Sequence, residues 1–310
     1  MMGSFPLFYK KETIIFEKCG IGHILFKFVL YNNCNCDFVK GGVRLNKKHW
    51  ALFCARVVPV ASISAAFFMV LGVLLAYEKG TNYFEPNAIL PILAVIWATL
   101  GFAAALIFAV IVPKEEIDPF SPFKAGLLTS LPAALGFGIG AILLAVEFFK
   151  NQSTLFLVAA LLLLASAAHV LLNKGDRAGA PLGFVPPVAC ALLIAVLYFD
   201  ASLEMNAPLK VAVQTALLPL MLYFTAELRY LLNREIPRLY FALALISIVL
   251  ASLCVLAVPV ACLMGSLQNT NCLAAALVVA GNLVTLLLKL KKYFAPIPSP
   301  ENDTKETDAQ

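Results

Sequence analysis

The sequence predicts an all-α integral membrane protein, folded as a polytopic bundle of eight transmembrane helices. Of its 310 residues, 61% are hydrophobic and only 13% are charged, whereas a soluble domain is about 45–50% apolar and about 25% charged. Such a chain cannot cover a water-facing surface, so lipid is its expected solvent. From Trp50 onward, long apolar runs alternate with short polar breaks. Crossing a hydrocarbon core about 30 Å thick takes roughly 20 helical residues, and these runs are of that length.

Helices fit these runs better than barrel strands, because no run shows the two-residue alternation of a membrane β-strand. The fifth run is the shortest, and Pro186 and Pro187 make its start the least defined boundary. We expect helices at residues 52–77, 87–112, 123–148, 154–173, 182–199, 208–232, 238–264 and 272–290.

The chain divides into three parts by composition. In residues 1–49 charges interrupt every apolar run, so we expect a cytoplasmic N-terminal segment. Residues 50–292 form the membrane domain. Residues 293–310 are Pro-rich, then polar and mildly acidic, which predicts a disordered cytoplasmic tail.

The start of the native protein is open to two interpretations. The tripeptide KGG at residues 40–42 can be encoded as a bacterial ribosome-binding site, and Val43 and Leu45 by alternative start codons. One hypothesis is therefore that residues 1–44 are translated upstream sequence and that the native chain begins near Leu45. The other keeps the whole segment as part of the protein.

Orientation follows from Lys and Arg, which membrane proteins concentrate in cytoplasmic loops. With the N-terminus placed inside, the inner flanks and loops near the span ends hold fifteen of these residues and the outer loops hold three. The bias predicts that both termini are cytoplasmic in the plasma membrane, expected to be a bacterial cytoplasmic membrane. The inner residues are Lys40, Arg44, Lys47, Lys48, Arg56, Lys114, Lys124, Lys174, Arg177, Arg229, Arg234, Arg238, Lys289, Lys291 and Lys292, and the outer ones are Lys79, Lys150 and Lys210.

The eight helices can be read as a tandem repeat of four, with half-repeats at residues 50–174 and 182–292. An even number of helices in each half would make the two halves parallel. The alternative is a chance alignment of evenly spaced apolar runs. The matching sequences are EPNA at 85–88 with EMNA at 204–207, and PVA at 59–61 with PVA at 187–189.

The sixth span carries several polar residues. At 100° per residue, Thr215, Pro219 and Tyr223 share one face, and Gln214 and Thr225 share a second. Polar groups in lipid seek partners on other helices, so both faces are expected to point inward. The alternative is interhelical hydrogen bonding without any ligand. The residues expected to line a ligand cavity are Gln214, Thr215, Tyr223 and Asn282.

Ionisable residues within spans are costly in lipid and are therefore functional candidates. All of them lie near span ends, where a side chain can also reach the interface. The best constellation is a buried ion pair between Glu227 and Arg56, because Arg229 is two residues from Glu227 and faces elsewhere on the helix. The candidates are Arg56, Glu147, His169, Glu227 and Arg229.

The third span contains Gly136, Gly138 and Gly140. We interpret this two-residue repeat as a kinked or locally loosened helix, not as a helix-packing motif of four-residue period.

No metal or cofactor is expected. The three histidines are far apart, which argues against a haem. Cys262 and Cys272 are the one cysteine pair placed to meet near the last outer turn, and no framework spacing supports a disulfide there. Residues of the types that zinc takes occur in the N-terminal segment, but their spacing matches no common zinc motif. They are Cys19, His23, Cys34 and Cys36.

The sequence contains no nucleotide-binding loop, zinc-protease motif or serine nucleophile motif. No catalytic residue is therefore assigned, and a non-enzymatic, transporter-like role for a small molecule or lipid is the leading hypothesis. The alternative is a membrane scaffold or subunit of a larger complex, with membrane-protein partners and no nucleic acid. A third hypothesis is an intramembrane lipid-modifying enzyme that uses Glu227, Tyr223 or His169.

The charge bias makes a direct prediction about sidedness. Green fluorescent protein fused after Gln310 should fluoresce in bacteria, because it folds in the cytoplasm, whereas alkaline phosphatase fused at the same place should be inactive. Phosphatase fused within the loop at residues 200–207 should be active. The reverse pattern would contradict the orientation.

Overall fold

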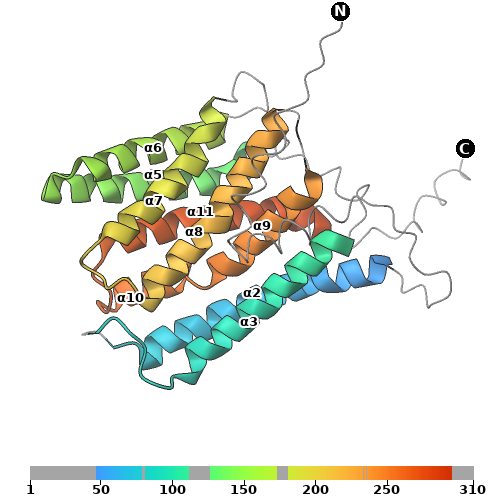
Figure 1. Ribbon diagram of the computed structural model, residues 1–310, viewed down its shortest axis with the longest axis horizontal. Coiled ribbons are helices and arrows are strands. Elements are labelled where there is room, and N and C mark those ends of the chain that lie inside the picture. Colours follow the sequence, from blue (N-terminus) through green and yellow to red (C-terminus); the bar gives the residue numbers. More distant parts are fainter. Residues whose placement is uncertain are drawn as a thin grey trace, which may run out of the picture. The chain divides into compact units, whose positions relative to one another are not determined.

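The computed structural model describes residues 47–78, 81–111, 126–172, 181–232, 234 and 236–294. The expectations for residues 1–46 and for the tail after residue 294, including the zinc-type residues and the alternative start, lie outside the described residues. The elements are α2 (Lys47–Ala76), α3 (Ile89–Ile111), α5 (Leu127–Asn151), α6 (Thr154–Leu172), the 3₁₀ helix η5 (Leu182–Phe184), α7 (Val185–Phe199), α8 (Pro208–Leu231), α9 (Pro237–Ser252), α10 (Ala257–Leu263) and α11 (Thr270–Phe294) (Figure 1).

Within the described residues, eight segments are helical, apolar and long enough to cross a membrane. They coincide closely with the predicted spans, so the prediction of eight membrane-length helices is confirmed. The fifth begins as predicted beside its two prolines, with η5 leading into α7. The seventh, Pro237–Leu263, consists of two helices, α9 and α10, instead of one. Which side of the membrane each terminus faces stays a prediction.

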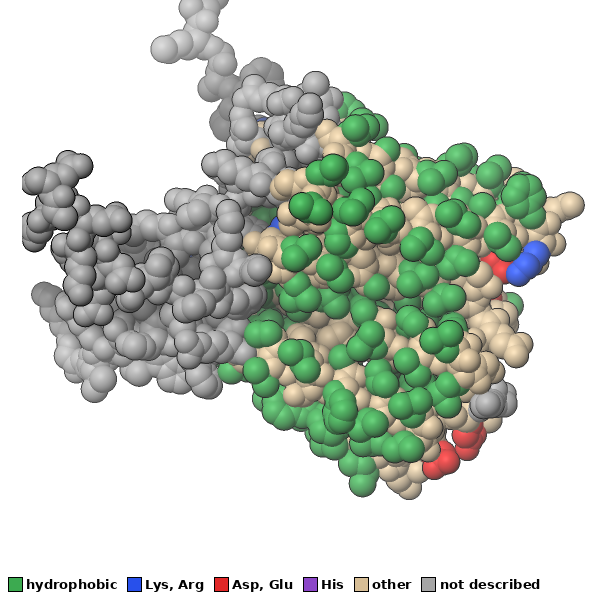
Figure 2. All heavy atoms as spheres, turned by 180° about the vertical axis from the view of Figure 1, so that it is seen from behind, with side chains coloured by type: hydrophobic (Ala, Val, Ile, Leu, Met, Phe, Trp, Pro, Cys, Tyr) green, Lys and Arg blue, Asp and Glu red, His purple; other side chains and the backbone are tan. Residues whose placement is uncertain are grey.

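The outside of the bundle is apolar. Leu128, Phe149 and Leu263 are 83%, 78% and 88% exposed. Exposing large apolar side chains to water is unfavourable, whereas exposing them to lipid is not. Figure 2 shows a described face covered with hydrophobic side chains, with the acidic and basic side chains confined to its edges. This surface is the one expected of a bundle surrounded by hydrocarbon.

The helices pack as two outer pairs around a central group. The pairs are α2 with α3 and α5 with α6, and α7 to α11 lie between them (Figure 1). In the central group α9 packs on α3, α11 packs on α5, and α7 packs on α6. Small residues allow these contacts; a Cβ on Gly101 of α3 would lie 3.0 Å from Cβ of Ala61 on α2 and 3.2 Å from Val249 on α9.

α5 and α11 approach so closely that only glycine fits where they cross. A Cβ on Gly281 would collide with the Pro132 carbonyl oxygen, and one on Gly136 would lie 2.7 Å from the Leu277 carbonyl oxygen. One on Gly140 would lie 2.8 Å from Val278. Backbones in contact gain dispersion energy that lipid cannot replace, which drives association of membrane helices.

The interpretation that these glycines contain no helix-packing motif of four-residue period is wrong, whereas a kink in this helix stays a prediction. α5 is one continuous helix from Leu127 to Asn151. Gly136 and Gly140 are four residues apart and face α11 together, whereas a Cβ on Gly138 would meet open space. The run therefore contains a packing motif of four-residue period, and Gly138 between them is incidental.

A hydrogen bond reinforces this contact. The Ala133 N–H of α5 donates to Thr285 Oγ1 of α11 over 3.0 Å. Pro132 precedes Ala133, and a proline ring inside a helix disturbs the hydrogen bonds of its own turn. Thr285 thus supplies a partner to backbone that would otherwise be costly to expose to lipid.

The tandem repeat stays a prediction. Its two tetrapeptides form comparable turns, because the Ala88 N–H donates to the Glu85 carbonyl and the Ala207 N–H to the Glu204 carbonyl, both over 3.1 Å. The turns differ at Asn87, which has φ of 68°, unlike its counterpart before α8. A twofold relation would set α9 against α6 as α5 is set against α11, and the principal neighbours of α6 among the described helices are α5 and α7.

The glycine contact predicts a sharp difference between neighbouring glycines. Gly281→Ala should destabilise the protein by about 1–3 kcal/mol, because α5 and α11 must move apart. Gly138→Ala is the matched control; it should be neutral or slightly stabilising, because alanine favours helix and has room. The fraction of monodisperse protein after heating in mild detergent measures both, and equal loss in the two variants would contradict the contact.

Candidate functional site

The end of the bundle at which α8 and α11 finish, here called the Lys289 end, holds a cluster of polar side chains from three helices. Lys289 Nζ of α11 donates to Tyr223 Oη of α8 over 3.0 Å. Tyr223 Oη in turn lies 2.6 Å from Tyr240 Oη of α9, and either hydroxyl can be the donor. The two tyrosine rings stack with centroids 4.9 Å apart, and the ammonium lies 5.6 Å from the Tyr223 centroid.

Glu227 completes the charge balance of this cluster. Its Oε1 lies 3.3 Å from Lys289 Nζ, and the two side chains are only 15% and 12% exposed. His169 of α6 is buried and lies within electrostatic range of the carboxylate. A carboxylate in so little water requires a cation. In this structure Lys289 supplies it.

The helical repeat explains why these residues meet. Tyr223 and Glu227 are four residues apart on α8, so they share one face. On α11, Asn282, Thr285 and Lys289 fall on one face by the same spacing, and this face packs toward α5 and α8. The cluster therefore forms where two polar faces come together.

The predicted pair of Glu227 with Arg56 is not tested, because the Arg56 side chain lies outside the described ones. α2, which carries Arg56, packs mainly on α3, α9 and α10, whereas α8 packs on α7, α9 and α11. Glu227 nevertheless has a described cation, Lys289. The Arg56 pair stays a prediction.

The other predicted cavity residues are mostly satisfied within their own helices. Thr215 Oγ1 donates to the Val211 carbonyl over 2.7 Å, and Asn282 Nδ2 donates to the Val278 carbonyl over 2.8 Å. Gln214 is half-buried. Of the four, the described contacts bring Tyr223 alone into the Lys289-end cluster, and a shared cavity stays a prediction.

Thr225 departs from the expected inward face. It is exposed, and its Oγ1 donates to the Met221 carbonyl over 2.9 Å. A hydroxyl can meet its hydrogen-bonding need this way on the lipid side, so polarity alone did not predict direction.

The seventh span is interrupted between α9 and α10. Residues 253–256 form turns instead of α-helix, and the N–H groups of Leu253 and Cys254 donate to carbonyls three residues back. In the apolar stretch of this span 67% of the residues are buried, the largest share among the eight described spans. Pro259 lacks an N–H and so removes the helical partner of the Val255 carbonyl. α10 then ends with Gly265 at φ 65°, where the Ser266 N–H donates to the Ala261 carbonyl over 2.9 Å in a Schellman cap.

Ser247, in α9 near the middle of the same span, has an unusual hydroxyl. It is 2% exposed, and its Oγ has no hydrogen-bond partner among the described residues. Six other hydroxyls of the described helices donate to a carbonyl one turn back. A buried hydroxyl without a partner costs free energy, so Ser247 and the interruption together make this span a candidate for function.

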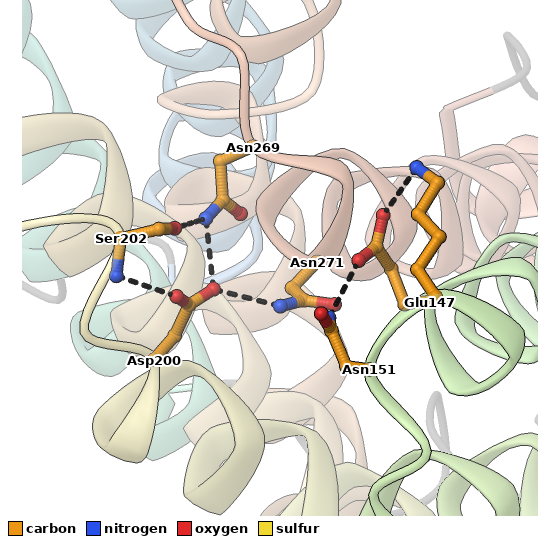
Figure 3. A network of polar contacts seen from close by, with 7 residues as sticks. Glu147, Asn151, Asp200, Ser202, Asn269 and Asn271 are labelled. Atoms are coloured by element: carbon orange, nitrogen blue, oxygen red, sulfur yellow. Dashed lines mark hydrogen bonds and ion pairs between the residues drawn. The ribbon is translucent and has the colours of Figure 1, made fainter.

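The opposite end of the bundle, the Asp200 end, is closed by a second network (Figure 3). Asp200 follows α7, and its carboxylate accepts hydrogen bonds from Asn269 Nδ2 over 2.8 Å and Asn271 Nδ2 over 2.7 Å. Its other oxygen accepts the Ser202 N–H over 2.9 Å. Asn269 Oδ1 also accepts the Cys272 N–H over 2.6 Å, as a cap at the start of α11.

Lys210 lies beneath this network, fully buried. Its ammonium donates to the carbonyls of Asp200 and Leu203, both over 3.0 Å. These bonds tie α8 to the loop that precedes it. Burial raises the pKa of the Asp200 carboxyl, but the hydrogen bonds from Asn269, Asn271 and Ser202 outweigh burial and hold the pKa below its ordinary value of 3.8. The carboxylate is therefore charged at neutral pH.

The cysteines offer no described redox or metal centre. Cys262 and Cys272 are both free thiols. Among the described residues, no three His, Cys, Asp or Glu side chains are placed to hold a metal ion.

Sequence reasoning missed the partners that complete both ends. The charge count placed Lys289 among the basic residues of the inner side. Its distance of seven residues from Asn282 and four from Thr285 indicated that all three share one face of the last helix. Tyr240 had no sequence signal. Asp200 directly follows a span, and Asn269 and Asn271 precede another, a pattern that indicates loop-to-loop contacts at one end.

Comparison of the sequence with protein-family models, curated proteins and solved structures found no match. The assignment therefore rests on the eight apolar helices. The chain is a multi-pass membrane protein. Its candidate functional features are the seventh span and the polar clusters at the two ends of the bundle.

The Asp200 network predicts an acid-sensitive element. Since the folded-state pKa is lowered, the stabilisation is present above the unfolded value and is lost as pH falls through the folded-state pKa. Asp200→Asn should lower stability by about 1–3 kcal/mol at neutral pH, because buried amides lose a charged acceptor. It should also flatten the loss of stability below about pH 4.

Thermal unfolding in detergent between pH 3 and 7 measures this effect. The control is Glu85→Gln, an exposed acid that should leave the acid profile unchanged. An Asp200→Asn profile that parallels the native one would contradict the role of the carboxylate.

Proposed function

We propose that the protein is a carrier that moves a small molecule or a lipid across the membrane, with both termini in the cytoplasm. The observation that carries the proposal is the interruption between α9 and α10 in the most buried span. The chain keeps right-handed helical dihedrals at Leu253 and Leu256, so the interruption is a local change of hydrogen bonding. Such a change at membrane depth is tolerated where the backbone is buried in protein or lines a water-filled cavity. In carriers, such discontinuous helices form the substrate site near the bilayer midplane.

The neighbourhood of the interruption supports this role. Ser247 lies six residues before it, roughly 9 Å along the helix, and its hydroxyl has no hydrogen-bond partner among the described residues. α9 packs on α8, which is itself interrupted in its hydrogen bonding by Pro219. Two adjacent proline-containing spans can bend without breaking the close contact of α5 with α11.

The two polar clusters fit the ends of such a carrier. The Asp200 network ties the α7–α8 loop to the start of α11, and the Lys289 cluster ties α8, α9 and α11 at the other end. Both are contacts that can separate, because each is a small set of hydrogen bonds. A carrier requires one end to open while the other stays closed.

Aqueous access to Ser247 tests the proposal. In a chain whose eight native cysteines are replaced, Ser247→Cys should react with a charged, membrane-impermeant thiosulfonate added to one side of sealed vesicles. A thiol must ionise in water to react, so labelling reports a wet pathway. We expect a rate on the order of tenfold above that of a lipid-facing thiol.

The matched control is Leu222→Cys on α8, where the native side chain is 47% exposed to the expected lipid. Ser247→Cys that is as unreactive as Leu222→Cys from both sides indicates a dry bundle. That result would reject the carrier and favour the scaffold or complex-subunit hypothesis.

A further inference from the structure

We propose that the Lys289 end is a binding site for a phosphate group, carried either by an anionic lipid headgroup or by a soluble phosphate compound. This deepens the carrier proposal by naming a substrate class, and rests on it only for movement across the membrane. Binding itself is tested separately.

The site is built from side chains that are already held in place. Tyr223 and Tyr240 are 2% and 0% exposed, and their stacked rings fix the positions of both hydroxyls. Lys289 Nζ has two described partners, Tyr223 Oη and Glu227 Oε1. An ammonium has three N–H bonds, so one of them has no acceptor among the residues that the structure describes.

The cluster remains reachable. The side chains of Lys289 and Glu227 are 12% and 15% exposed, less than surface residues but more than the tyrosines beneath them. A ligand arriving from the Lys289 end therefore meets the ion pair first. The tyrosine hydroxyls lie directly behind it.

The surrounding charge favours an anion over a cation. Arg229 and Arg234 are exposed at this end, and Arg238 lies two residues before Tyr240. Among the described side chains at this end, Glu227 is the acidic one, and it stands beside Lys289, Arg229, Arg234 and Arg238. An excess of fixed positive charge at the end of a bundle raises the local concentration of anions.

Phosphate suits this arrangement because its oxygens can accept several hydrogen bonds at once. One oxygen can accept the third N–H of Lys289, which has no acceptor among the described residues, while another lies near the Tyr223 hydroxyl. Hydrogen bonds between ionised partners are about twice as strong as neutral ones. Glu227 competes with the ligand for Lys289, so it acts as an internal counter-ion that an incoming phosphate displaces.

This competition gives the proposal its sharpest test. Glu227→Gln removes the competitor and leaves Lys289, so it should bind phosphate about tenfold more tightly. The neutral pair Lys289→Met with Glu227→Gln should bind at least about tenfold more weakly than the native chain. The double variant leaves no unpaired charge in the membrane, which keeps folding testable.

The probes are inorganic phosphate, sn-glycerol 3-phosphate and dihexanoyl phosphatidic acid, each added to the full chain in neutral detergent at constant ionic strength. The shift of the unfolding midpoint with concentration gives the affinity. Stronger binding of phosphatidic acid than of the other two identifies a lipid headgroup, and comparable binding identifies a soluble phosphate. Lys150→Met with Glu147→Gln, which removes the ion pair at the Asp200 end, should leave every affinity unchanged.

Two results would overturn the proposal. They are no binding of any probe to the native chain and an unchanged affinity in Glu227→Gln. Each is distinct from failure of the carrier. If phosphate binds but Ser247→Cys does not react with the thiosulfonate, the phosphate site stands and the carrier proposal fails.

Discussion

The contact of α5 with α11 is the constraint on which both polar clusters depend. α11 carries Asn271 at one end and Lys289 at the other, so the position of this helix sets both networks. Its backbone rests on Gly136 of α5 with no room for a side chain between them. α11 also packs on α8 and α9, and its described hydrogen bonds to α8 run through the side chain of Lys289.

The bundle combines glycine contacts with proline interruptions. Glycine packing and the bond from Ala133 to Thr285 hold α5 and α11 as one unit. Pro219 and Pro259 lie in the neighbouring spans, where they weaken the helical hydrogen bonding locally. The close glycine contact thus lies in α5 and α11, and the prolines that weaken helical hydrogen bonding lie in the neighbouring α8 and α10.

The eight helices were predictable because lipid imposes one strong rule, a long apolar run with its backbone bonded internally. Polar side chains follow a weaker rule. Thr225 and Thr215 satisfy themselves within α8, so their presence did not reveal a cavity. The contact of Glu227 with Lys289 was likewise beyond reach, because it requires knowing that α11 lies beside α8. The interruption of α9 and α10 had a partial signal in Pro259, but prolines occur in continuous membrane helices as well.

The glycine face of α5 also has a consequence for synthesis. The ribosome completes α5 well before α11, and at about 5–20 residues per second the delay is on the order of 10 s. During that time the groove around Gly136 and the Ala133 N–H face lipid without their partner. The glycine face of the third span therefore lacks its packing partner until the eighth span has been inserted. In that interval a membrane chaperone or protease could bind this face.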